Sequence, residues 1–288
     1  RAGNRRVIGS SFTVDSTPPS GVSILAPAAN SFVSGLATIS GKAVDAGGLA
    51  RVELTLKRNS DGKYWAGNTW GTSAPVKLVT AISGSAWHKT GGFPIGGSSD
   101  ATKVLNPGVY TATATAFDRA GLSSSATTSF NVERTPPVVV IDTPLAQASV
   151  TSLPYIGGTI NDEAGGSGVY SVSVFLKRNA DAKWWDGTTF AGATPVALRA
   201  ALGSHGLWKK IGGLPLPTAT DAAKKLSPGA YTITVWGYDR AGNRTTIGSS
   251  FSVVAAPAQP DGAGAGAGSA DQPTADDPGE APAPQPSS

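Results

Sequence analysis

The chain has 288 residues, of which 40% are hydrophobic, 37 are glycine and 21 are proline; it contains no cysteine and carries a net charge of +4. This length suggests about two domains, and the missing cysteines exclude disulfides, thiolate metal sites and cysteine nucleophiles. No run of about 18 apolar residues occurs, so the sequence predicts no membrane insertion within this segment.

The first 14 residues, RAGNRRVIGSSFTV, nearly duplicate residues 240–253, RAGNRTTIGSSFSV. The later copy closes a full repeat, so we predict that residues 1–14 are the closing hairpin or strand of a preceding repeat.

Strict alternation of apolar and polar residues marks the strands of a first unit, which we place at 15–132. In ARVELTLKR, Val52, Leu54 and Leu56 share one face and polar residues share the other. VYTATATAFD (residues 109–118) alternates in the same way. This period of two predicts half-buried antiparallel strands.

Between these strands lies KYWAGNTW (residues 63–70), which sets three aromatic residues around a Gly-Asn pair. Gly-Asn is a turn-forming pair, and aromatic residues on opposite arms of a hairpin stabilise it by packing together. The alternative is that flat exposed rings stack on sugar faces. A tyrosine then follows a Pro-Gly bend at Tyr110, which is typical of the tyrosine corner of immunoglobulin-like sandwiches.

The second unit, 133–254, repeats the first with a spacing of 120 residues between LKRNSDGKYW (from Leu56) and LKRNADAKWW (from Leu176). Its own PGAY ends at Tyr231, and a short helical turn is expected at 220–226, with Thr220 as its cap. The final segment, 255–288, is rich in Ala, Gly and Pro with five acids and no basic residue, and we predict a disordered acidic linker.

The motifs TPP, ISGKAVDAGG or GGTINDEAGGSG, and PGxY followed by DRAG together resemble bacterial Ig-like or fibronectin-III-like repeats of large surface proteins and adhesins. The resemblance spans residues 15–254 and the N-terminal copy. It implies an all-β chain of tandem immunoglobulin-like antiparallel β-sandwiches with a disordered C-terminal tail. One departure is Leu122, where asparagine is usual.

Acidic residues recur where an Ig-like chain enters the domain, joins its second and third strands, and turns in its last hairpin. They are Asp15, Asp45 and Asp118 in the first unit, and Glu133, Asp162, Glu163 and Asp239 in the second. The resemblance implies Ca²⁺ binding at such junctions, for which backbone carbonyls and water have to complete a shell of six to eight oxygens. The alternative is that Asp118 and Asp239 only form turns by bonding nearby N–H groups.

The candidate glycan-binding residues are those of the two aromatic hairpins: Tyr64, Trp65, Trp70, Trp184, Trp185 and Phe190. Packing within the hairpin is favoured, because both copies place the pair on either side of the turn. Trp87 and Trp208 are assigned to the core, and Trp236 is the strongest candidate for an exposed aromatic.

These observations predict a non-catalytic role. The two histidines, His88 and His205, occupy different positions in the repeat, and neither a phosphate-binding loop nor an H-E-x-x-H zinc motif is present. We expect structural or adhesive spacer repeats of a secreted or cell-surface bacterial protein, whose signal lies outside this fragment. The expected partners are neighbouring Ig-like domains and a cell-surface glycan or protein, with no nucleic acid. The alternative is a glycan-binding accessory module of a larger extracellular protein or enzyme.

The net charge bears on whether the chain has an anionic partner. Before residue 255 the chain has 23 basic and 14 acidic residues, a net charge of +9. That excess either favours an anionic partner or only keeps the surface solvated, and the short basic runs favour the second interpretation.

Overall fold

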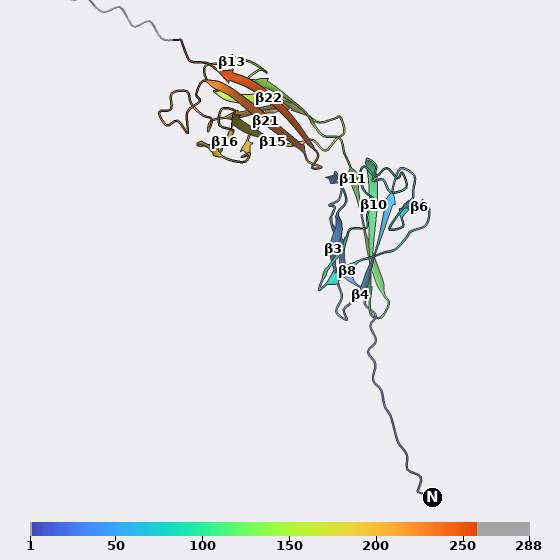
Figure 1. The fold of residues 1–288 in the computed structure, drawn as a ribbon. Coiled ribbons are helices and arrows are strands. Elements are labelled where there is room, and N and C mark those ends of the chain that lie inside the picture. Colours follow the sequence, from blue (N-terminus) through green and yellow to red (C-terminus); the bar gives the residue numbers. More distant parts are fainter. Residues whose placement is uncertain (1, 258–288) are drawn as a thin grey trace, which may run out of the picture. The chain divides into compact units, whose positions relative to one another are not determined.

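The computed structural model describes residues 2–257, and nearly all of their regular structure is β-strand (Figure 1). The two predicted units each fold as a sandwich of one four-stranded and one seven-stranded sheet, which confirms the predicted all-β immunoglobulin-like class. The expected linker at 255–288 lies, apart from its first three residues, outside the described residues. No helix among residues 2–257 has both the length and the apolar character that a membrane span requires.

The first domain contains eleven strands, several of them only two or three residues long. They are β1 (Ser20–Ala26), β2 (Phe32–Val33), β3 (Thr38–Val44), β4 (Leu49–Arg58), β5 (Tyr64–Trp65), β6 (Trp70–Thr72), β7 (Leu78–Val79), β8 (Ala81–Ser83), β9 (Ala86–Thr90), β10 (Gly108–Asp118) and β11 (Ser123–Val132). One sheet has the order β1-β3-β9-β8, and the other has the order β2-β11-β10-β4-β5-β6 with β7 paired to β4.

The second domain repeats this topology strand for strand. Its strands are β12 (Val138–Thr143), β13 (Ser149–Val150), β14 (Tyr155–Asn161), β15 (Val169–Arg178), β16 (Lys183–Trp185), β17 (Phe190–Gly192), β18 (Leu198–Arg199), β19 (Ala201–Leu202), β20 (Leu207–Ile211), β21 (Gly229–Asp239) and β22 (Arg244–Val253). The sheets are β12-β14-β20-β19 and β13-β22-β21-β15-β16-β17, with β18 paired to β15.

The core lies between the two sheets of each domain and uses the predicted inner faces. Val52, Leu54 and Leu56 of β4 are buried, as is every second residue of β10 from Tyr110 onward. Trp87 and Trp208 are also buried in the two cores, as predicted. The alternation in the sequence therefore reports directly which face of each strand is removed from water.

Both tyrosine corners form. The hydroxyl of Tyr110 donates to the carbonyl of Asn106 at 2.8 Å, and the hydroxyl of Tyr231 donates to the carbonyl of Ser227 at 2.8 Å. Each bond ties the start of the penultimate long strand to the loop before it, and each ring lies in the core.

The helical turn expected at 220–226 is replaced by non-helical turns. Asp221, rather than Thr220, supplies the side-chain acceptor: its carboxylate takes the N–H of Ala223 at 2.9 Å. The segment is then drawn back to the chain, because the N–H of Leu226 bonds the carbonyl of Leu216 at 2.9 Å. These contacts satisfy backbone groups that a helix would otherwise have paired internally.

Candidate metal centres

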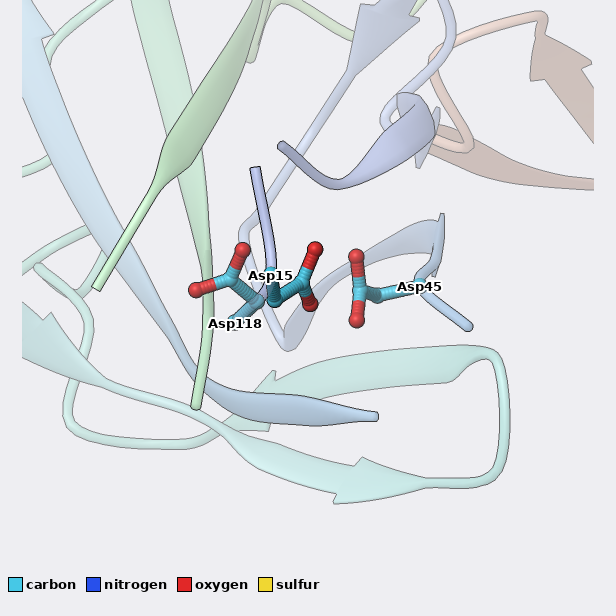
Figure 2. Close-up of side chains that lie close together, drawn as sticks. All are labelled: Asp15, Asp45 and Asp118. Atoms are coloured by element: carbon cyan, nitrogen blue, oxygen red, sulfur yellow. The ribbon is translucent and has the colours of Figure 1, made fainter. Parts of the chain in front are cut away.

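Three carboxylates of the first domain meet at one end of the sandwich. Asp15 belongs to the lead-in before β1, Asp45 follows β3, and Asp118 ends β10. One carboxylate oxygen from each lies within 4.8 Å of the others. Figure 2 shows the three side chains side by side, with the Asp15 carboxylate between the other two in this view.

The turn after β10 explains why Asp118 points where it does. Its Oδ1 accepts the N–H of Leu122 at 2.8 Å, and the turn closes through Gly121, whose φ of 90° lies in the left-handed region that favours glycine. The aspartate of the DRAG motif therefore stabilises a turn by accepting a nearby N–H, as the alternative to calcium binding proposed, but it does so with only one of its oxygens. The second oxygen of the same carboxylate, however, is not used by the turn.

That second oxygen, Oδ2 of Asp118, is buried and accepts no hydrogen bond, and Asp118 as a whole is only 2% exposed. Oδ1 of Asp45 is also buried without a partner. None of the ion pairs within residues 2–257 involves the three carboxylates. Two like charges about 5 Å apart repel by roughly 3 kcal/mol at an effective dielectric constant near 20. The three carboxylates therefore lie close together without a salt-bridge partner among the described residues.

The second domain brings together the equivalent residues. Glu133 directly follows β11, Asp162 follows β14, and Asp239 ends β21; one oxygen from each lies within 4.8 Å of the others. Glu133 and Asp239 are buried. The carboxylate of Glu133 accepts the N–H of Ser167 at 3.3 Å, and that of Asp162 accepts the N–H of Gly168 at 2.6 Å.

Asn243 distinguishes the second cluster from the first. Its side-chain amide donates to Oδ2 of Asp239 at 2.8 Å and to Oε1 of Glu133 at 3.2 Å. Leu122 occupies the same place in the first domain and has no side-chain donor, which is why Oδ2 of Asp118 keeps no partner. Asn243 was not predicted as a site residue. The only signal for it in the sequence is that the second repeat has asparagine where the first has Leu122.

Two groups of the second cluster are electrostatically strained. Burial raises the pKa of Glu133, and the charge of Asp239 adds to the shift. Burial also raises the pKa of Asp162, with a contribution from Glu163. Removal from water disfavours a charged carboxylate. A bound cation would act in the opposite direction, because it favours the ionised form.

Glu163, the remaining residue of the predicted set, is exposed and lies outside the three-carboxylate group. The other six predicted residues divide into one cluster for each domain, so each cluster is built from a single sandwich and its own lead-in residue. The donors are all hard oxygens, and buried unpartnered oxygens occur at Asp45, Asp118 and Asp162. This chemistry fits Ca²⁺, which prefers carboxylate, carbonyl and water oxygens.

Four of the six candidate glycan-binding residues lie in the domain cores, which corrects the glycan-binding assignment for these four. Trp65, Trp70, Trp185 and Phe190 are at most 4% exposed. Trp65 and Trp70 pack with ring centroids 5.3 Å apart, and the Trp65 indole N–H donates to the carbonyl of Gly92 at 2.7 Å. Rings whose faces and N–H groups are already occupied cannot stack on a sugar.

A row of aromatic rings continues from each hairpin into the core. In the second domain the successive centroid distances are 4.9 Å, 5.8 Å and 5.4 Å, along Trp185, Phe190, Tyr231 and Phe251. This row links the hairpin to β21 and then to the closing strand β22. The turn is therefore aromatic because its side chains belong to the domain core.

The remaining candidate aromatics are half-buried. They are Tyr64, Trp184 and Trp236. Trp236 was expected to be the most exposed, but its ring lies 4.5 Å from that of Phe175, and the Arg244 guanidinium lies 4.5 Å from its centre. Phe175 projects from β15 on the same side of the sheet, a position held by threonine in the first domain.

Residues 21–114, which lie in the first domain, match the family model of the bacterial Ig domain. The second domain repeats its strand order. A comparison with curated proteins found no match.

Several solved structures are similar to the chain. The fibronectin(III)-like modules of Clostridium thermocellum CbhA are 12% identical, with a TM-score of 0.39, 81% of this chain covered and 93% of theirs. A tetra-tandem repeat from the extending region of a large adhesion protein is 18% identical, with a TM-score of 0.29 and coverages of 76% and 45%. A 1.5-MDa bacterial ice-binding adhesin is 13% identical, with a TM-score of 0.29 and coverages of 76% and 57%.

Proposed function

We propose that the two domains are non-catalytic spacer repeats of a secreted or cell-surface protein, and that Ca²⁺ holds the lead-in segment of each domain against its loops. One observation carries the proposal. The same three-carboxylate group recurs in both domains, and in the first domain it contains a buried oxygen without a partner. In a chain of tandem domains, a calcium site repeated at each domain entrance would stiffen the junctions, and stiff junctions keep a stalk extended.

The lead-in residue connects each cluster to the segment that precedes its domain. Glu133 follows the last residue of β11, the closing strand of the first domain, and yet its carboxylate joins loops of the second domain. Asp15 has the corresponding place before β1. A group that holds Glu133 therefore fixes the segment between two domains, whereas the two loop carboxylates alone would only stabilise one domain.

In a calcium-bound form, three carboxylates of each domain would be ligands of the ion. Asp15, Asp45 and Asp118 would hold the ion in the first domain; Glu133, Asp162 and Asp239 would hold it in the second. The ion would supply positive charge that offsets the mutual repulsion of the carboxylates. Asn243 already offsets part of this repulsion in the second domain, so the first domain depends more strongly on the ion.

The primary experiment is unfolding of the full chain in Ca²⁺, in Mg²⁺ and in EDTA. Binding to the folded state alone stabilises it by about 2.7 kcal/mol at a ligand concentration 100 times the Kd. We expect Ca²⁺ to raise the unfolding midpoint of both domains, and Asp118→Asn to abolish the response of the first. Asp61→Asn is the matched control, because Asp61 pairs with Arg58 and lies outside the cluster. Identical midpoints in Ca²⁺ and EDTA would exclude the proposed role of the ion.

A second readout addresses the junction itself. Arg134 adjoins Glu133, so trypsin cleavage after Arg134 reports on the mobility of the lead-in segment. We expect Ca²⁺ to slow this cleavage in the wild-type chain and not in Glu133→Gln. Equal cleavage rates with and without Ca²⁺ would contradict junction stiffening even if the domains themselves were stabilised.

The spacer role is tested separately, by small-angle scattering and a glycan array. We expect no glycan binding, and a longer maximum dimension in Ca²⁺ than in EDTA. A glycan signal from the wild-type chain that is lost in Trp184→Ala and Tyr64→Ala would contradict a purely structural role.

A further inference from the structure

Residues 2–14 carry the pattern of a buried strand but pair with no strand among residues 2–257. Ile8, Phe12 and Val14 are exposed by 81%, 87% and 76%, and residues 2–19 form no strand (Figure 1). The three side chains are separated by even numbers of residues, so in an extended chain they lie on one face. An apolar face of this kind gains nothing from exposure to water, and a sheet is where such a strand is stable.

The sequence of the segment identifies the position it fits. Eleven of the 14 residues of 1–14 are identical to 240–253, and the differences are Arg6, Val7 and Thr13 in place of Thr245, Thr246 and Ser252. In the second domain this sequence forms β22, which pairs along its whole length with β21 and, at its end, with β13. Figure 1 shows β22 beside β21 in the seven-stranded sheet.

The residues of β22 that bury themselves are the ones that the segment keeps. Phe251 and Val253 are 2% and 4% exposed, and Ile247 packs against the core. Phe12, Val14 and Ile8 are their exact chemical equivalents in the segment. Phe251 is also the last ring of the aromatic row, 5.4 Å from Tyr231, so Phe12 would complete the same row in another sandwich.

The turn before the strand is kept as well. Asn4 corresponds to Asn243, whose amide bonds the buried carboxylate of Asp239. By contrast, β11 of the first domain shares only three of ten residues with 5–14, whereas β22 shares seven. The segment therefore matches a sandwich of the second-domain type rather than any Ig-like sheet.

We infer that residues 5–14 are a complete closing strand, and that its partner is an Ig-like sandwich of the second-domain type with an unfilled closing-strand position. The recognition is β-strand addition: the backbone pairs with the edge of the acceptor's penultimate strand, and Ile8, Phe12 and Val14 enter its core. This inference does not depend on calcium and is tested independently of it.

The first test asks whether the segment is competent as a closing strand within the full chain. The triple variant Thr245→Arg, Thr246→Val and Ser252→Thr gives β22 the sequence of residues 5–14. The Thr245 hydroxyl donates to the carbonyl of Pro137, so a modest loss is expected. We expect cooperative unfolding of the second domain, with a urea midpoint lowered by less than about 1 M. A second domain that is unfolded in buffer would overturn the inference.

The second test captures the strand in place. In a chain that ends at residue 243, the position of β22 is vacant, and the chain contains no natural cysteine. Thr232 of β21 pairs with Ser250 of β22, and Ser11 corresponds to Ser250. We expect Ser11→Cys and Thr232→Cys to form a disulfide under mild oxidation, within one chain or between two. Directly opposed residues of antiparallel strands lie at a distance that a disulfide can bridge.

Two controls make the capture specific. Phe12→Asp places a charge where the aromatic row ends, and we expect it to reduce disulfide formation at least tenfold. The same cysteine pair in the full chain, where β22 occupies its own place, is expected to show a similar reduction. Absence of the disulfide in the chain ending at residue 243, or equal yields in all three proteins, would overturn the inference.

Discussion

Replacement of Trp65 by alanine is the most direct test of the aromatic hairpin as core structure. The ring is 2% exposed, packs 5.3 Å from Trp70 and donates its indole N–H to the carbonyl of Gly92. Removal of a buried tryptophan costs about 3–5 kcal/mol, and the lost hydrogen bond adds about 1 kcal/mol. We therefore expect the first domain to lose about 4–6 kcal/mol, a large share of the 5–15 kcal/mol typical of a domain.

The assay is urea unfolding followed by NMR, which resolves the two domains. With a slope of about 2 kcal/mol/M, the midpoint of the first domain falls by 2 M or more, while that of the second is unchanged. Tyr64→Ala is the matched control: Tyr64 is the half-buried neighbour in the same hairpin, and its cross-strand contacts are worth about 1 kcal/mol. A Trp65→Ala midpoint within 0.5 M of wild type would refute the reasoning and reopen a ligand-binding role.

Three further predictions concern single contacts. Tyr231→Phe removes the bond to the Ser227 carbonyl, and we expect a loss of about 1–2 kcal/mol in urea unfolding of the second domain. Leu122→Asn supplies Asp118 with the missing donor, so in EDTA we expect the first domain to gain about 1 kcal/mol and its Ca²⁺ response to shrink. Glu133 has a raised pKa in the folded state, so in EDTA its contribution to stability is present below pH 4.5 and is lost as the pH rises through the folded pKa; Glu133→Gln should remove this dependence in a pH series of melts.

Each of these has an outcome that would contradict it. An unchanged Tyr231→Phe midpoint would mean that the corner bond has no net value. A Leu122→Asn variant that is less stable in EDTA would show that lost packing outweighs the new bond. If wild type and Glu133→Gln respond identically to pH, the carboxyl is not strained by its burial.

Much of the fold could be predicted, because its signals lie between neighbours in the chain. Alternation identified the inner faces of β4 and β10, Pro-Gly-x-Tyr identified the corner, and the repeat predicted that one strand topology occurs twice. The positions of the acidic residues in the repeat also predicted that they lie together at one end of the sandwich. These features depend on local geometry, in which side chains alternate across a strand and turn residues have characteristic backbone angles.

Prediction was weaker where several polar or aromatic residues compete for one place. Trp236 was expected to be exposed, but Phe175, 61 residues earlier, packs against it. Glu163 was grouped with Asp162, and its carboxyl does contact that of Asp162, but the residue is exposed and lies outside the three-carboxylate group. Neighbouring carboxylates look equivalent in a sequence, and only the path of the loop decides how far each one is removed from water.

The sequence by itself determined the inner faces of the strands and the repeat of one order of motifs, and it predicts a closing strand at residues 1–14. Tertiary structure decided which aromatics are core and which carboxylate oxygens have partners. The difference between Asp118 and Asp239 illustrates the reason: their turns are nearly identical in sequence, but the free oxygen depends on whether Leu122 or Asn243 faces it. Strand patterns follow from the alternating geometry of one chain, whereas the satisfaction of a buried charge depends on every group that packing brings around it.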